Sequence, residues 1–136
     1  MSVLGGMAFL CPECGKPGLT ITSRIELRSD AKWDEIALQL VRCGECGFKG
    51  IATYQENRWG SLDSEIVHHY GYRVAPQLWD HLEKTIATCP DPSSGRCTCL
   101  GCEELNVTDQ AGAWNWLRDE KVANQVGGIF EMTIKG

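Results

Sequence analysis

The sequence predicts a small α+β protein, with three antiparallel strands near the N-terminus and a helical segment in the C-terminal half. The chain has 136 residues, which is the length of one domain. Apolar and polar residues alternate in its first half, as in half-buried strands, whereas apolar residues recur at helical spacing after Pro76. Eight cysteines fall into two sets, within residues 11–46 and 89–102. We therefore expect two metal sites to hold this small fold together.

Composition and charge limit the classes of protein that this chain can belong to. Hydrophobic residues make up 43% of the chain and charged residues 23%, which excludes a wholly disordered chain. The formal net charge is −5, and eight thiolates with two divalent cations take it to about −9, which excludes a strongly basic nucleic-acid binder. No apolar run approaches the roughly 20 residues of a transmembrane helix, and residues 1–10 lack the basic start of a signal peptide. We therefore expect a soluble cytoplasmic protein with no membrane partner.

Three strands are expected around the first cysteine set. Residues 19–28 alternate between apolar and polar side chains, with apolar residues at odd positions except Ser23. Residues 35–42 fit two patterns: a strand with apolar residues at every second position from Ile36, or a helix with apolar residues at helical spacing from Trp33. We favour the strand because a cysteine pair follows at once, and a hairpin returns that pair to the first one. Residues 48–57 then form the third strand.

The first cysteine set has the spacing C-x2-C-x28-C-x2-C. Two Cys-x-x-Cys turns at the base of a hairpin bring four thiolates to one tetrahedral site, which zinc prefers. Gly15 and Gly47 follow the two pairs and permit the tight backbone that points N–H groups at sulfur. A thioredoxin-type redox pair is the alternative, but Gly15, Pro17 and Gly18 oppose the helix that it requires. The predicted ligands of the first ion are Cys11, Cys14, Cys43 and Cys46.

These cysteines and glycines resemble the pattern of the zinc ribbon superfamily over residues 9–58, which is under half of the chain. The resemblance implies a three-stranded antiparallel ribbon with one structural zinc ion. It is specific for fold and metal but not for function. Zinc ribbons occur in transcription factors, polymerase subunits, ribosomal proteins and enzymes.

A second metal site is expected in the C-terminal half. Residues 59–75 form a polar connector, and Pro76 suits the first turn of a helix with one apolar face. A loop rich in Pro, Ser and Gly follows, and its four cysteines within 14 residues have too little apolar content around them to pack without a metal. Zinc is the first choice there, an iron–sulfur cluster the second, and exposed thiols or a Cys89–Cys97 disulfide the alternatives without metal. The predicted ligands are Cys89, Cys97, Cys99 and Cys102.

The remaining C-terminal residues predict a second helix and a closing strand. Thr108 or Asp109 caps a helix that carries Trp114, and Gly127–Gly128 ends it. Apolar residues alternate over residues 130–134, which indicates a strand. Trp116 cannot share the helical face of Trp114, so we expect Trp116 to be exposed and to anchor a protein partner.

No catalytic machinery is recognisable in the sequence. It contains no nucleophile motif, phosphate-binding loop or H-E-x-x-H motif. The adjacent His68 and His69 point to opposite faces of a strand and so do not ligate one ion together. Eight cysteines in two sets of four leave no open metal position, so we expect no enzyme activity.

The sequence therefore predicts a zinc-binding module in three parts: a ribbon over residues 1–58, a connector over 59–75 and a helical segment over 76–136. Its expected role is protein interaction or regulation, with an unidentified protein partner. One alternative is a transcription-related ribbon that binds nucleic acid, and another is an iron–sulfur or redox protein that uses the second cysteine set. Nucleic acid is disfavoured because residues 11–50 carry equal numbers of acidic and basic side chains. The basic residues of a nucleic-acid patch are Lys16, Arg24, Arg28, Arg42 and Lys49.

Overall fold

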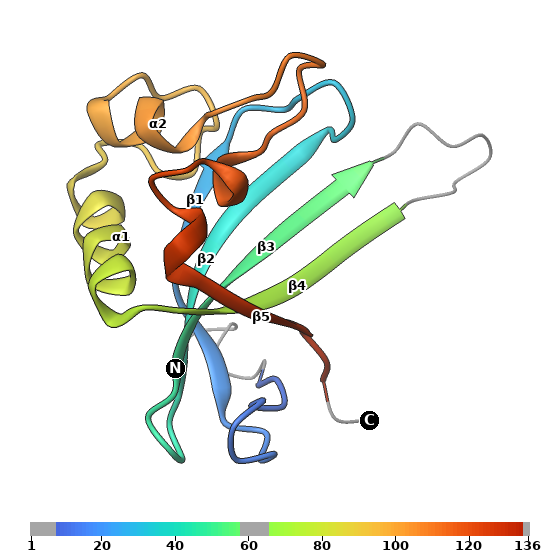
Figure 1. The fold of residues 1–136 in the computed structure, drawn as a ribbon, viewed down its shortest axis with the longest axis vertical. Helices are drawn as coiled ribbons and strands as arrows, with labels where there is room; N and C mark the ends of the chain where they lie inside the picture. The colour runs from blue at the N-terminus through green and yellow to red at the C-terminus, as the bar shows by residue number, and fades with distance from the viewer. Residues whose placement is uncertain (1–7, 58–65, 135–136) are drawn as a thin grey trace.

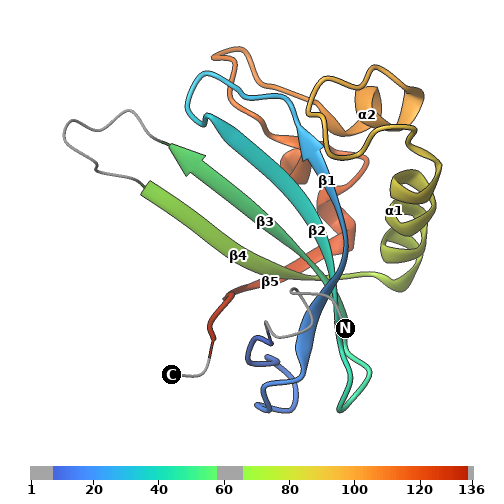
Figure 2. The ribbon, with the colours of Figure 1, turned by 180° about the vertical axis from the view of Figure 1, so that it is seen from behind.

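The structure is a computed structural model that describes residues 8–57 and 66–134. One antiparallel sheet of five strands follows chain order. The C-terminal segment crosses in front of this sheet in Figure 1 and behind it in Figure 2, so it covers one face. The strands are β1 (Leu19–Leu27), β2 (Glu35–Cys43), β3 (Lys49–Asn57), β4 (Ile66–Val74) and β5 (Val126–Glu131), and the helices are α1 (Pro76–Thr88) and α2 (Leu100–Leu105). The α+β class is confirmed, but the sheet has five strands where the sequence predicted three for the ribbon.

Strand β2, which lies between β1 and β3, is buried on both faces. Leu38 and Leu40 belong to the core beneath the helices, whereas Val41 belongs to a smaller cluster on the other side. Apolar residues on both faces give β2 a nearly continuous apolar run, which is why its sequence also fitted a helix. The strand interpretation of residues 35–42 is confirmed.

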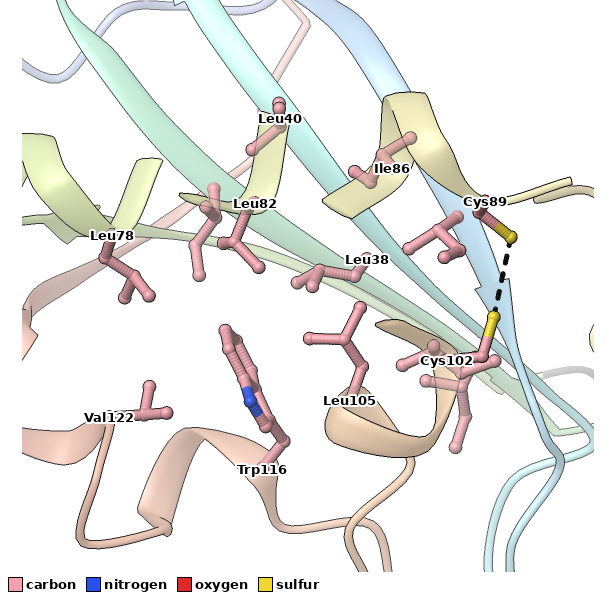
Figure 3. Packing of buried hydrophobic residues seen from close by; sticks show 14 of the residues in the cluster. Leu38, Leu40, Leu78, Leu82, Ile86, Cys89, Cys102, Leu105, Trp116 and Val122 are labelled. Carbon is pink, nitrogen blue, oxygen red and sulfur yellow. Dashed lines mark hydrogen bonds between the residues drawn. The ribbon is translucent and has the colours of Figure 1, made fainter. Parts of the chain in front are cut away.

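The main core lies between the sheet and a layer formed by α1, α2 and the C-terminal segment (Figure 3). The apolar side of α1 packs on β1, β2 and β3, and the indole N–H of Trp79 donates to the carbonyl oxygen of Gly50 at 3.0 Å. Burial of these large side chains contributes about 1.5–3 kcal/mol each. The labelled residues of this core are Leu38, Leu40, Leu78, Leu82, Ile86, Cys89, Cys102, Leu105, Trp116 and Val122.

A second, smaller cluster lies at the opposite end of the sheet. Phe9 bridges to Leu19 at the start of β1 and to Ile134 beyond β5, so a short N-terminal segment connects the two edges of the sheet there. The backbone N–H of Phe9 donates to Leu19 O at 2.7 Å, and that of Leu10 donates to Thr133 O at 2.8 Å. We call this set the ribbon-end cluster; its buried members are Phe9, Cys11, Leu19, Val41, Cys43 and Ala52.

Two expected elements differ in the structure. Of the connector predicted over residues 59–75, Ile66–Val74 form β4, and the part up to residue 65 lies outside the described residues. The closing strand begins earlier than predicted, because β5 includes Gly127 and Gly128 and ends at Glu131. Strand β4 carries polar and aromatic side chains on both faces, so its sequence has no clear period.

The helix predicted from residue 108 is wrong. The Asp109 carboxylate accepts hydrogen bonds from the backbone N–H groups of Ala111 and Ala113 at 2.9 and 3.0 Å, which closes a turn instead of capping a helix. Two short 3-10 turns follow, at Trp116–Arg118 and Ala123–Gln125.

The expected exposure of Trp116 is also wrong. Its side chain is only 1% exposed, belongs to the main core and stacks on Trp114. Trp114 and Trp116 do not lie on helical faces, because this segment is not an α-helix.

No helix in residues 8–57 and 66–134 combines the length and the apolar character that a bilayer crossing requires.

Candidate metal centres

The first cysteine set meets at the ribbon end of the sheet. Cys11 and Cys14 lie in the turn before β1, Cys43 ends β2, and Cys46 lies in the turn between β2 and β3. The sulfurs of Cys11 and Cys46 are 3.6 Å apart, and those of Cys14 and Cys43 are 3.7 Å apart. All four sulfurs lie within 4.8 Å of one another, so the structure brings together the whole predicted set. We call these four residues the ribbon tetrad.

The two turns of the ribbon tetrad have matching backbone geometry. Gly15 and Gly47 have φ angles of 74° and 81°, which residues with a Cβ atom rarely adopt. Each glycine N–H donates to the carbonyl oxygen of the first cysteine in its pair, at 2.9 and 3.0 Å. The Glu13 N–H points at the Cys11 sulfur at 3.4 Å, and the Glu45 N–H points at the Cys43 sulfur at 3.3 Å. These donors stabilise thiolate charge, as in the supporting shell of a metal site.

Within the ribbon tetrad, the surroundings favour ionisation of the Cys43 thiol over that of Cys46. Burial raises the pKa of Cys43, but the backbone N–H groups of Cys46 and Glu45 outweigh it and lower the pKa to about 7. For Cys46 the N–H of Phe48 lowers the pKa, but desolvation and the neighbouring sulfurs outweigh it and raise the pKa to about 12. Thiolates this close repel one another unless a cation lies between them. A divalent cation removes this conflict because it binds all four ligands as thiolates.

The second cysteine set also meets in space, beside the main core. Cys89 follows α1, Cys97 and Cys99 lie in the loop after it, and Cys102 lies on α2. The Cys89 sulfur is 3.6 Å from that of Cys102 (Figure 3). It is also 3.6 Å from that of Cys97. All four sulfurs lie within 4.8 Å of one another. We call them the core tetrad, since Cys102 is 1% exposed and packs with the large apolar side chains.

The disulfide considered for Cys89 and Cys97 does not form in this structure. A disulfide bond is about 2.05 Å long, and these sulfurs are 3.6 Å apart. All eight cysteines are free. The Cys99 sulfur accepts the Cys102 N–H at 3.4 Å, which lowers the Cys99 pKa to about 7, whereas burial and then the neighbouring sulfurs raise that of Cys102.

The loop of the core tetrad covers the edge of the sheet. The Glu26 N–H on β1 donates to Pro92 O at 2.6 Å, and the Arg28 N–H just beyond β1 donates to the Asn106 side chain at 2.9 Å. These contacts shield an edge that can otherwise pair with another chain. No pattern in the sequence indicates these contacts, because Pro92 and Asn106 are far from β1 along the chain.

The paired histidines lie apart from both tetrads. His69 bonds to Gln39 through a 2.7 Å contact, and burial lowers its pKa. The His68 ring packs against Trp33, with ring centroids 4.7 Å apart. Among the described residues, the two cysteine tetrads are the groups of side chains that could hold a metal ion, so the protein has two candidate metal sites.

No protein-family model, curated protein or solved structure matches this chain.

Proposed function

We propose that this protein binds two zinc ions as structural metals and acts as a protein-interaction module. The spacing of the sulfurs carries the metal part of the proposal. Four sulfurs at about 2.3 Å from one zinc ion form a tetrahedron with edges of about 3.8 Å. The separations of 3.6 and 3.7 Å between sulfurs in the two tetrads are close to that edge.

The same spacing favours a single ion over an iron–sulfur cluster in the core tetrad. In a cluster the cysteines bind different iron atoms, so their sulfurs are spread around several metals. In the core tetrad all four sulfurs lie within 4.8 Å of one another. Four thiolates also complete a tetrahedral shell and leave no position for substrate, which supports a structural role.

The open edge of β5 supports the interaction role. On the outer edge of β1, Phe9 bonds to Leu19 and Pro92 accepts the Glu26 N–H, whereas no strand among the described residues pairs with the outer edge of β5 from Val126 to Glu131. The Ile129 side chain on this strand is 60% exposed. An extended peptide of a partner protein can add to such an edge through main-chain hydrogen bonds and contact the apolar side chain. We propose such a peptide as the partner.

The nucleic-acid alternative receives less support from the basic side chains. Arg24 pairs with Glu26 at 2.8 Å, and Arg28 pairs with Glu103. These carboxylates offset two of the five positive charges on which the patch depends. A holo charge of about −9 further opposes phosphate binding.

Cobalt substitution tests the metal part. Titration of the metal-free protein with Co²⁺ should saturate at two equivalents, with the intense visible bands of tetrahedral cobalt and the charge-transfer absorption of thiolate ligands. Zinc should then displace the cobalt and bleach the colour. Weak bands typical of octahedral cobalt, or saturation at one equivalent, would contradict two four-thiolate sites.

Peptide selection tests the interaction part separately. A phage-displayed library selected against the zinc-loaded protein should yield peptides that protect β5 amides from hydrogen exchange. Ile129→Asp should abolish their binding, whereas Leu100→Asp, the same change at a side chain that is 91% exposed on α2, should not. If the selected peptides leave the β5 amides unprotected from exchange, β5 is not the binding edge, and the proposal of two zinc sites is unaffected.

A further inference from the structure

A cavity of about 420 Å³ lies between the sheet and the C-terminal segment, away from both tetrads. Its floor comes from β3 and β4, and its walls come from the β1–β2 loop and from residues 109–118, which cross this face of the sheet in Figure 1. The volume falls within the range of small-molecule sites. Neither the cysteines nor the open edge of β5 contributes to it, so it represents a feature beyond the proposed function.

Hydrogen bonds connect the two walls of this cavity to each other. One carboxylate oxygen of Asp30 accepts the backbone N–H groups of Lys32 and Trp33, at 2.8 and 2.6 Å. The other accepts the N–H of Trp114 at 2.6 Å. The Ala31 N–H also donates to Gly112 O at 3.1 Å. The cavity is therefore preformed, which lowers the entropic cost of binding.

Four aromatic side chains line the cavity. They are contributed by Trp33, His68, Tyr72 and Trp114, from three separate parts of the chain: the β1–β2 loop, β4 and the segment 109–118. Trp114 is held by a hydrogen bond from its indole N–H to Leu105 O at 2.7 Å. Fixed rings of this kind favour a planar ligand that stacks against them.

The unpaired charges at the cavity are positive. Asp30 and Asp109 use their carboxylates on backbone N–H groups of the walls. Lys32 and Arg118 line the cavity, are exposed and have no ion-pair partner in the part of the chain that the structure describes. These two cations favour an anionic group on the ligand.

One polar group in the cavity wall has no hydrogen-bond partner among residues 8–57 and 66–134. This group is the side-chain oxygen of Asn115, which is buried. A buried acceptor without a partner costs about 1–3 kcal/mol. Rotation of this side-chain amide toward the cavity offers a ligand both an acceptor and donors.

We infer that this cavity binds a small planar anion, an aromatic or heteroaromatic ring that carries a carboxylate or a phosphate. The ring lies against Trp33, His68 and Trp114, and the anionic group lies at Lys32 and Arg118. Both parts of the ligand are required, because each wall supplies a ring and a cation: the β1–β2 loop carries Trp33 and Lys32, and residues 109–118 carry Trp114 and Arg118.

Chemical-shift titration of the zinc-loaded protein tests this inference. Uridine monophosphate represents the phosphate source and benzoate the carboxylate source. At least one of them should shift the indole and amide signals of Trp33, His68 and Trp114 in a saturable manner. Uridine, benzamide and inorganic phosphate, each lacking one part of the ligand, should bind at least about tenfold more weakly.

Charge variants provide the matched control. Lys32→Ala combined with Arg118→Ala should weaken binding of the active probe about tenfold or more. Lys84→Ala combined with Arg96→Ala removes the same charges from exposed positions outside this cavity and should leave binding unchanged. The inference is overturned if neither probe gives saturable shifts at these signals, if phosphate or uridine binds as tightly as the monophosphate, or if both double variants weaken binding equally.

Discussion

Replacing Cys43 by serine should unfold one end of the protein and leave the other end folded. Cys43 is 1% exposed and ends β2, where its sulfur lies 3.7 Å from that of Cys14. The ribbon-end cluster around it has six buried residues, two of which are tetrad cysteines. The main core contains sixteen buried residues and its own tetrad. Loss of the ribbon tetrad therefore removes the main support of the small cluster only.

The loss of the metal costs far more free energy than the change of side chain from cysteine to serine. Structural zinc in a site of this kind contributes about 10–16 kcal/mol, and a buried serine hydroxyl without a partner costs only about 1–3 kcal/mol. Whole domains are stable by about 5–15 kcal/mol, so the loss of the metal exceeds what a few apolar side chains can offset.

Amide hydrogen exchange measures this outcome residue by residue. In Cys43→Ser, protection should be lost at Leu19, Val41 and Ala52 and kept at Leu38 and Leu82. Chelation of the ribbon metal in the unmodified protein should give the same pattern, whereas Cys102→Ser should unfold the main core. Native protection at Leu19 and Val41 in the Cys43 variant, or its loss at every residue, would refute the division into two separately supported ends.

Three further outcomes are expected. Zinc affinity should be highest above pH 7 and fall as the pH is lowered, because protons compete with zinc for the thiolates, and the pKa values of Cys43 and Cys99 are about 7. Release of zinc to a chromogenic chelator measures this affinity at each pH, and an affinity that does not change with pH would contradict the expectation. Trp116→Ala should reduce the free energy of unfolding by about 3–5 kcal/mol in urea titrations, and a loss below 1 kcal/mol, taken as roughly the surface value, would contradict its core position. Oligonucleotides should bind only weakly at physiological salt, and submicromolar affinity lost in Arg24→Ala plus Arg28→Ala would reverse that expectation.

The strands around the ribbon tetrad could be predicted because their signals are local. Alternation identified β1, and the cysteine spacing resolved the ambiguity of β2. The same spacing predicted that Cys11, Cys14, Cys43 and Cys46 meet, since a hairpin must return the second pair to the first.

The remaining structure depends on contacts between distant residues. Trp116 is buried because Leu105 and Val122 come to it through loops that carry no periodic pattern. Asp30 binds the N–H of Trp114 from the far end of the chain, which fixes an irregular segment where the sequence predicted a helix. The cavity between these segments exists only in three dimensions, so no spacing in the sequence could reveal it.

The zinc content of each tetrad tests the central claim most directly. Native mass spectrometry of the protein purified without chelator should show two zinc ions per chain. Cys43→Ser and Cys102→Ser should each retain one ion, because each variant keeps one complete tetrad. One zinc ion or fewer in the unmodified protein, or iron in place of zinc in either tetrad, would contradict the account.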